Sequence, residues 1–187
     1  ECFAARAYEV KDGILQRGGV DLGSHISHPV LTWTAPAGEW EIWTFGTRRE
    51  EISMNPLMGG AGDLVIREFY QKFQDHNRGE TSKGLNYFFN DELQIGLGKY
   101  RFENDDHVIG DGKFAWNPDF AAEFLRRKGY DLLEVLPAMW EEMGDITPKV
   151  RIDYADVRMS LMEERYFEPI YNWHTARSMI FGCDQSS

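Results

Sequence analysis

Two short apolar runs, far apart in the sequence, place the strongest constraint on how this chain folds. Residues 85–89 (LNYFF) lead into Asn90-Asp91-Glu92, and residues 179–183 (MIFGC) lead into Asp184. Short apolar runs bounded in this way are typical of strands buried in a parallel sheet. Parallel strands need a long crossover between them, and right-handed pairing is the default. The sequence therefore predicts an α/β fold.

The segments around these runs predict helices. Leu64, Val65, Phe69 and Phe73 recur at helical spacing, and Asp63 is placed to cap that helix. Residues 93–114 are expected to form a long irregular loop. The other expected helices are residues 117–129, with Asn117 as the cap and Gly129 as the stop, residues 132–136 after the cap Asp131, and residues 151–177, kinked or split at Pro169.

The first fifty residues read as β structure. Residues 8–15 predict a hairpin around the turn pair Asp12-Gly13. Residues 30–33 and 40–45 predict two more strands flanking Ala35-Pro36-Ala37-Gly38, in a short antiparallel unit. The tryptophans at positions 33, 40 and 43 are best explained as packing within this unit.

The charge of the chain narrows the classes of partner. The formal net charge is −11 over 187 residues, and an acidic surface repels phosphate backbones, so nucleic-acid binding is disfavoured. The sequence contains no apolar stretch of roughly 18 residues, so we expect no membrane partner. P-loop, G-x-S-x-G and G-x-G-x-x-G motifs are absent. The acidity suits a protein acting on neutral sugars or peptides, or it serves solubility alone.

Asn90-Asp91-Glu92 is the sharpest candidate for chemistry. In parallel sheets and (β/α) barrels the carboxyl ends of the strands carry the active site. Burial beside Phe88 and Phe89 would raise the pKa of a carboxyl group, as a general acid near neutral pH requires. The alternative is that these residues cap a following turn.

Asp184 stands in the equivalent place after the second run. Two acids at two strand ends would make the pair that glycosidases use, with a separation of ~5–5.5 Å for retaining and ~6.5–9.5 Å for inverting chemistry. Asp184 could equally be a solvated acid at a strand end. Trp116 could stack on a sugar ring or belong to the core.

Metal binding has less support. Residues 103–111 gather four acids and His107, and oxygen ligands of this kind suit calcium, but the spacing does not match the known calcium-loop pattern. A solvated loop is the favoured interpretation, and we assign no metal ligands. His25 and His28 lie three apart in a loop that would not orient them. Cys2 and Cys183, without a C-x-x-C motif, settle neither a disulfide nor a compartment.

An ordered series of segments resembles bacterial α-L-rhamnosidase-like enzymes, glycoside hydrolase family 106 and its relatives. Residues 31–42 (LTWTAPAGEWEI) resemble the W-x-x-P-x-G-x-W segment that precedes their barrel, and residues 88–92 (FFNDE) resemble their F-x-D-E strand end. The remaining matching segments are residues 60–64 (GAGDL), 116–120 (WNPDF), Phe124 with 129–133 (GYDLL), and 151–154 (RIDY).

The resemblance implies a (β/α)8 barrel of the TIM type that hydrolyses a terminal sugar, with inversion and with an associated calcium ion. Glu92 carries over as the general acid with Asp91 beside it, and Asn90, Trp116 and Asp184 would line the sugar site. Secretion or a periplasmic location would also follow. Asn90 replaces an expected threonine-like residue, and the Gly-rich segment lacks an expected acid–lysine pair, so the sugar could differ from rhamnose.

We therefore predict a β extension over residues 1–50 and a partial (β/α)8 barrel over residues 51–187. A complete barrel needs about 250 residues, so this length suffices for about half of one. An open half-barrel exposes strand edges, and we expect self-association or pairing with the missing portion. The alternatives are a non-catalytic carbohydrate-binding or scaffold fragment, and a peptide-hydrolysing or unrelated barrel.

Overall fold

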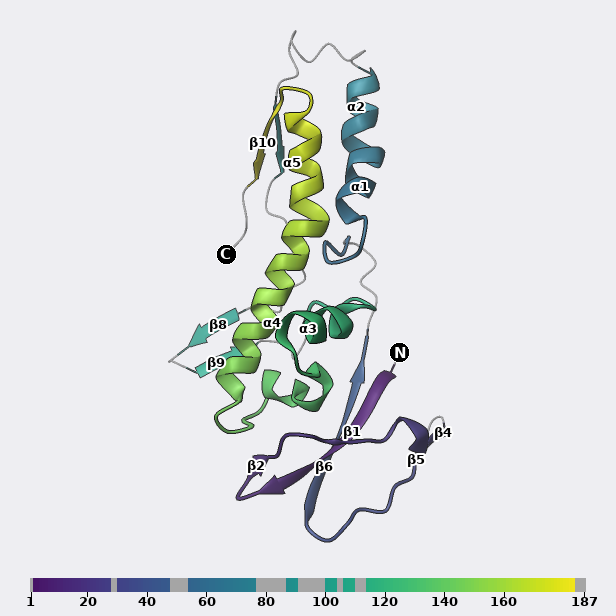
Figure 1. Ribbon diagram of the computed structural model, residues 1–187, viewed down its shortest axis with the longest axis vertical. Coiled ribbons are helices and arrows are strands. Elements are labelled where there is room, and N and C mark those ends of the chain that lie inside the picture. Colours follow the sequence, from purple (N-terminus) through teal and green to yellow (C-terminus); the bar gives the residue numbers. More distant parts are fainter. Residues whose placement is uncertain are drawn as a thin grey trace. The chain divides into compact units, whose positions relative to one another are not determined.

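The computed structural model describes residues 2–27, 30–47, 54–76, 87–90, 100–103, 106–109 and 114–183. It is a mixed α/β structure (Figure 1). The chain forms two compact units, each assembled from segments distant in sequence. The first unit comprises Glu1–Glu51, Lys99–Gly112 and Pro118–Val157, and the second comprises Ile52–Gly98, Lys113–Asn117 and Arg158–Ser187. The predicted boundary at residue 50 stays a prediction.

An antiparallel sheet built around β1 forms the base of the first unit. The predicted hairpin is confirmed, with Val10 opposite Leu15. Asp12 and Gly13 both have positive φ, 53° and 76°, as a primed two-residue turn requires. The strands of this sheet are β1 (Cys2–Lys11), β2 (Ile14–Leu15), β3 (Val20–Asp21) and β6 (Glu39–Gly46).

The antiparallel unit expected from residues 30–33 and 40–45 takes a different form. β5 (Val30–Leu31) pairs with β4 (Ile26–Ser27), which follows the short helix η1 (Gly23–His25), whereas β6 pairs with β1 along its length. β1 offers β6 a longer ladder than the two residues of β5 would. Trp33 and Trp40 still pack in the unit, as predicted, with ring centroids 5.5 Å apart against the core residues Ala5, Ala7 and Leu22.

Helices cover this sheet within the first unit. Gly129 ends α3 in the left-handed conformation, and the carboxylate of Asp131 accepts a hydrogen bond from the Leu133 amide at 2.9 Å, both as predicted. The Tyr8 hydroxyl donates to the Leu133 carbonyl at 2.6 Å, which ties β1 to η5. The helices are α3 (Phe120–Lys128), η5 (Leu132–Glu134), η6 (Leu136–Met139) and α4 (Thr147–Met162), which continues into the second unit.

Two details of these helices differ from prediction. Asp119, not Asn117, stands at the N-cap of α3, and the side-chain nitrogen of Asn117 instead donates to the Leu57 carbonyl. The long helix begins at Thr147, earlier than expected, where the Thr147 hydroxyl accepts a hydrogen bond from the Met143 amide at 2.8 Å.

The expected long loop over residues 93–114 contains a hairpin. β8 (Tyr100–Glu103) and β9 (Asp106–Ile109) pair antiparallel, with Phe102 opposite His107. The segments YRFE and DHVI are each only four residues long. A pattern of polar and apolar residues this short does not distinguish a strand from a loop.

Two helical runs form the helical layer of the second unit. The first opens at Gly60, whose φ is 78°, so Asp63 lies inside the helix and does not cap it as predicted. Both runs widen into a π-helical turn, and the second such turn ends two residues before Pro169, which lacks an amide hydrogen. The runs are α1 (Ala61–Val65), η2 (Ile66–Tyr70) and α2 (Gln71–His76), then the end of α4 with η7 (Glu163–Phe167) and α5 (Glu168–Thr175).

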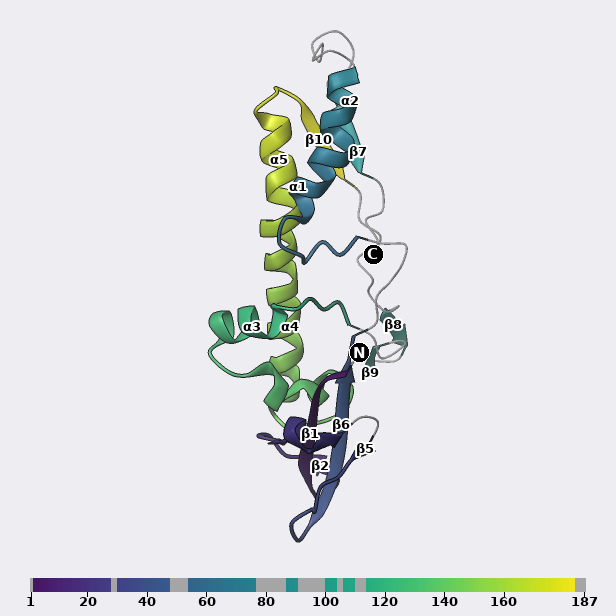
Figure 2. The same cartoon turned by 90° about the vertical axis from the view of Figure 1, so that its right-hand side faces the viewer.

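The two predicted parallel strands pair in the second unit. β7 (Tyr87–Asn90) and β10 (Ile180–Cys183) are parallel, with Phe88 opposite Phe181 and Asn90 opposite Cys183. Figure 2 shows both strands beside the helical runs. The parallel pairing is therefore confirmed, while the described strands do not close into a barrel. The core beneath the pair contains Ala61, Tyr70, Phe88, Tyr166, Ile170, Trp173 and Met179.

Candidate functional site

The shared edge of β7 and β10 is the place where the sequence predicts a site. Because Asn90 and Cys183 are register partners in a parallel pair, the carboxyl ends of both strands lie at one edge. Asp91 and Glu92 follow Asn90 in the sequence, and Asp184 follows Cys183. These three predicted site residues lie outside the described part of the chain, and their roles remain predictions.

A buried histidine on α5 packs against both strands. The imidazole of His174 is fully buried, and its ring centroid lies 5.6 Å from that of Phe88 and 5.1 Å from that of Phe181. Tyr70 and Trp173 complete the surroundings at 4.9 and 5.0 Å. This aromatic packing positions the middle of each strand on α5 and so fixes where the strand ends emerge.

The protonation of His174 follows from its contacts. Nδ1 lies 2.7 Å from the carbonyl oxygen of Ile170, which makes Nδ1 the protonated nitrogen. Nε2 is buried and has no hydrogen-bond partner among the described residues. Burial lowers the pKa of His174, and the nearby Arg177 guanidinium lowers it further. A neutral imidazole therefore lies under the candidate site.

The turn into β10 is held by a compact set of polar contacts. The Trp173 indole and the Arg177 guanidinium both donate to Oε1 of Gln71, each at 3.2 Å. The Arg177 guanidinium also lies 4.1 Å from the centre of the Trp173 ring. Ser178 adopts a positive φ of 55° in the turn itself. These contacts fix the start of β10 against α2.

Tyr70 links the helical layer to the middle of β7. Its ring is buried, and its centroid lies 4.9 Å from that of Phe88. Burial raises the pKa of Tyr70 to about 12, with smaller contributions from Tyr166 and Cys183. The hydroxyl thus stays protonated at neutral pH.

Trp116 lies in the same unit, in the segment 114–117 that precedes α3. Its side chain is half-buried, and its carbonyl oxygen accepts a hydrogen bond from Asn55 Nδ2 at 2.7 Å. Neighbouring Asn117 is 2% exposed and donates to the Leu57 carbonyl at 2.6 Å. Stacking of Trp116 on a sugar remains a prediction. Among the predicted site residues that the structure describes, Asn90 is the one that lies at the end of a strand.

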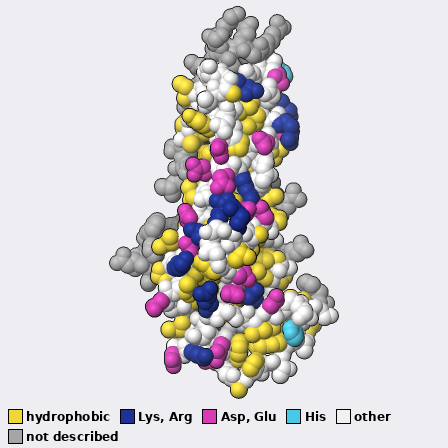
Figure 3. Space-filling model, in the orientation of Figure 1, with side chains coloured by type: hydrophobic (Ala, Val, Ile, Leu, Met, Phe, Trp, Pro, Cys, Tyr) yellow, Lys and Arg dark blue, Asp and Glu magenta, His cyan; other side chains and the backbone are white. Residues whose placement is uncertain are grey.

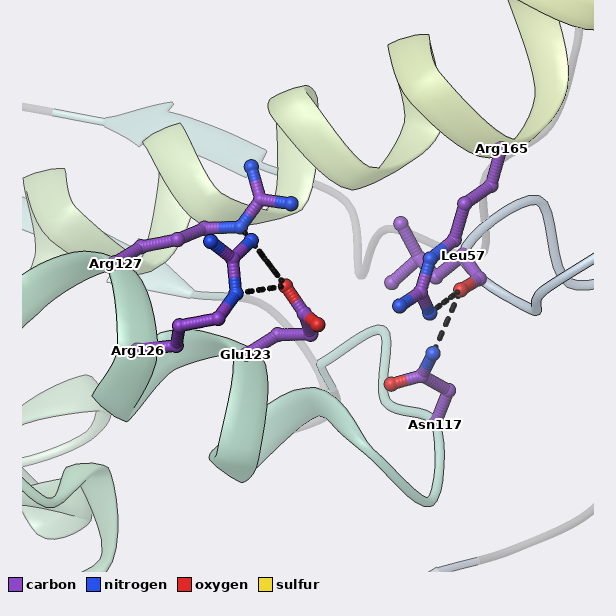
Figure 4. Close-up of polar contacts among 6 residues, drawn as sticks. All are labelled: Leu57, Asn117, Glu123, Arg126, Arg127 and Arg165. Atoms are coloured by element: carbon purple, nitrogen blue, oxygen red, sulfur yellow. Dashed lines mark hydrogen bonds and ion pairs between the residues drawn. The ribbon is translucent and has the colours of Figure 1, made fainter.

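Arg165 contacts the loop around Leu57, a contact that the sequence did not indicate. It donates to the same Leu57 carbonyl at 2.7 Å, so that one carbonyl receives both Arg165 and Asn117 (Figure 4). Asn55 closes the loop by accepting a hydrogen bond from the Leu57 amide at 3.0 Å. Because the acceptor is a backbone carbonyl, no side-chain pattern in the sequence could have revealed the contact.

The described residues include two cysteines but no cluster of candidate metal ligands. Across these residues, no three histidine, cysteine or acidic side chains gather where they could hold a metal ion. The loop considered for calcium falls partly outside them, so calcium stays a prediction. Cys2 and Cys183 are both exposed free thiols. Within the part of the chain that the structure describes, every helix is too short or too polar to cross a membrane.

Charged side chains of both signs are interspersed over the face of the molecule shown in Figure 3. The described residues form ion pairs such as Lys72–Glu68 at 2.5 Å and Lys128–Asp156 at 2.5 Å.

The chain is similar to parts of two known proteins. No family model matches the chain. A curated protein of Formosa agariphila named "Putative beta-glucuronidase" is 26% identical over 153 residues, which are 79% of this chain and 13% of that protein. The rhamnosidase from Novosphingobium sp. PP1Y shares the fold, with a TM-score of 0.57 and 15% identity, over 89% of this chain and 16% of its own. The chain thus spans a small part of each relative, and it is related at a coarse level to glycoside-hydrolase-type proteins.

Proposed function

We propose that this chain is part of a glycoside hydrolase that cleaves a terminal sugar by carboxylate general acid/base catalysis. Glu92 is the general acid, with Asp91 beside it. Asn90, Trp116 and Asp184 line the sugar site. The preferred substrate is an α-L-rhamnoside-like glycoside, and a glucuronide is the second substrate to test because of the name of the Formosa protein.

The observation that carries the proposal is the parallel register of β7 and β10. Asn90 opposite Cys183 means that the chain leaves both strands at one edge, directly before Asp91-Glu92 and Asp184. Glycoside hydrolysis needs a carboxyl group that protonates the leaving oxygen, and the end of a parallel strand is where Glu92 would present one, with Asp184 beside it in the sugar site. His174, Phe88 and Phe181 form a neutral aromatic layer on one face of the two strands. A layer of low polarity beside a carboxyl group favours its protonated form, as a general acid requires.

The proposal also extends to the fold and the setting. The parallel pair would belong to a (β/α)8 barrel whose remaining strands, and a further catalytic carboxylate, come from polypeptide outside these 187 residues. The 13% and 16% coverage of the two relatives supports this extension. An associated calcium ion and a secreted or periplasmic location are parts of the same proposal.

The test compares the longer protein that contains these residues with the 187-residue chain on a panel of nitrophenyl glycosides. The panel includes α-L-rhamnoside and β-glucuronide. We expect the longer protein to cleave at least one of them, and Glu92→Gln to reduce kcat by about 10²–10⁴-fold, the contribution typical of a general acid.

Glu141→Gln is the matched control, because Glu141 is exposed in the first unit and far in sequence from the strand ends. It should leave kcat unchanged. If no glycoside is cleaved, or if Glu92→Gln is as active as Glu141→Gln, the catalytic proposal is wrong. A protein that binds sugars without cleaving them would then be the non-catalytic scaffold.

A further inference from the structure

Both helical runs of the second unit contain a π-helical turn, and each turn has one buried residue, a tyrosine. Tyr70 is the last residue of η2, and Tyr166 lies within η7. Single π-helical turns within α-helices are rare and occur frequently at functional sites. The ring centroid of Tyr70 lies 4.9 Å from that of Phe88 on β7, so this tyrosine faces the strands that carry the candidate site.

The ring and the hydroxyl of Tyr70 have different surroundings. The ring packs among Phe88, Trp173 and His174, with centroid distances of 4.9, 5.7 and 4.9 Å. The hydroxyl makes no hydrogen bond to a described residue, yet its oxygen is not among the fully buried atoms that lack a partner, so it retains contact with solvent. Tyrosine hydroxyls in buried positions usually have a hydrogen-bond partner. This hydroxyl therefore has a donor and an acceptor that the described part of the chain does not use.

The hydroxyl of Tyr70 lies toward the end of β10. Side chains alternate along a strand, so Cys183 projects from β10 on the same side as Phe181, which packs on the helical layer. Tyr166 and Cys183 both raise the pKa of Tyr70, which requires their side chains to lie near its hydroxyl. Cys183 is exposed and is the register partner of Asn90. The hydroxyl thus borders the strand edge at which the sugar site is proposed.

We propose that the Tyr70 hydroxyl hydrogen-bonds a hydroxyl group of the sugar bound at the end of β7 and β10, and so helps to determine which sugar is accepted. This proposal rests on the proposed function for the position of the sugar. A sugar hydroxyl both donates and accepts, as the phenol does, so the two groups satisfy each other without a charge. A site that hydrogen-bonds a substrate hydroxyl discriminates against an analogue that lacks it, because the protein group is then left unpaired. Tyr70 takes part in recognition and not in proton transfer.

The experiment combines Tyr70→Phe in the longer protein with monodeoxy analogues of the glycoside that it cleaves, each lacking one hydroxyl group. Tyr70→Phe keeps the ring and its packing, and Tyr171→Phe, on α5 in the same unit and 59% exposed, is the control. We expect Tyr70→Phe to raise KM for the parent glycoside by about 3–10-fold with little change in kcat, the effect of losing one uncharged hydrogen bond. For the analogue that lacks the contacted hydroxyl, the same variant should have no further effect. Tyr171→Phe should leave KM unchanged for every substrate.

A second measurement follows sugar binding without catalysis. Cys183 is an exposed free thiol at the strand edge, so a bound sugar should slow its alkylation by iodoacetamide, read by mass spectrometry of the peptide that contains it. The sugars used are L-rhamnose and D-glucuronic acid. Tyr70→Phe should raise the sugar concentration needed for half-protection by about 3–10-fold, and Tyr171→Phe should leave it unchanged.

Three results would overturn the proposal. The first is an equal loss for the parent glycoside and all its analogues, which would give the Tyr70 hydroxyl a structural role. The second is a Tyr70→Phe variant that behaves like Tyr171→Phe, and the third is an alkylation rate of Cys183 that neither sugar changes. Failure of the proposed function is seen separately: if Glu92→Gln retains activity while protection of Cys183 depends on Tyr70, the catalytic proposal is wrong and the sugar contact stands.

Discussion

Gly62 on α1 lies directly against the backbone of Tyr166 on η7. A Cβ atom at position 62 would stand 2.7 Å from the Tyr166 carbonyl oxygen and 3.0 Å from Cβ of Pro169. The π-helical turn before Pro169 places this carbonyl on the side of α1. Glycine therefore sets how closely the two helical runs of the second unit approach, and so how the strands above them are supported.

Gly62→Ala should destabilise the chain by about 1–3 kcal/mol, because the opposing atom is backbone and cannot move aside cheaply. Chemical denaturation followed by circular dichroism measures the change. Gly59→Ala is the matched control, since nothing lies within 4 Å of a Cβ at that position. Equal stability of the two variants would mean that the helices tolerate a wider spacing.

His174 should make stability depend on pH. Its pKa is lowered in the folded protein by burial, whereas in the unfolded chain it is about 6.5. Above that value both states are neutral. As the pH falls below it, the unfolded state binds a proton that the folded state does not, so the free energy of unfolding falls.

We expect this loss between pH 7 and pH 5 in urea titrations, and a flatter dependence in His174→Phe. His25→Gln, at an exposed position, should keep the slope of the unmodified chain. If His174→Phe retains the full slope, other groups account for the pH dependence.

Tyr8 should contribute to the first unit through its hydroxyl. The side chain is fully buried and donates to the Leu133 carbonyl at 2.6 Å. Tyr8→Phe keeps the ring but deprives this carbonyl of the donor, which should cost about 1–2 kcal/mol. Tyr171→Phe, at a surface position that is 59% exposed, should change the unfolding midpoint little. A Tyr8→Phe variant as stable as Tyr171→Phe would show that water replaces the hydroxyl.

Arg165 should matter for the loop that holds Trp116 in place. Arg165→Met keeps much of the side-chain volume and removes the hydrogen bond to Leu57. We expect faster amide exchange at Leu57 and Met58, and a loss of about 1–2 kcal/mol of stability. Arg126→Met, which removes the ion pair of the exposed Arg126 side chain with Glu123 on α3, is the control and should leave this exchange unchanged. Unchanged exchange in Arg165→Met would leave Asn117 as the sufficient donor.

The sequence predicted those parts of the fold whose signals are local. The Asp12-Gly13 turn, Gly129 and the Asp131 cap each depend on neighbouring residues, and the structure confirms them. The parallel pair was also predictable, because two apolar runs with a helical crossover leave few alternatives.

Pairings between distant residues were not predictable in the same way. β6 could have paired with the strand before it, β5. It pairs with β1 because that ladder is longer, and the length of the ladder is known only when both strands are seen in the structure. The π-helical turns and the Arg165–Leu57 contact depend on backbone atoms, which every residue carries. Of the candidate site, the edge at Asn90 was predictable, whereas the buried His174 beneath it had no signal beyond one histidine in a helical pattern.

The dependence of rate on leaving group tests the central claim, that Glu92 is a general acid, most directly. Glycosides with leaving groups of increasing pKa would be compared in the longer protein and in its Glu92→Gln variant. We predict that the variant loses least activity on the most activated aryl glycosides and progressively more as the leaving group becomes more basic, because a poor leaving group depends most on receiving a proton. An equal loss for all leaving groups, or no loss for any, would contradict the assignment.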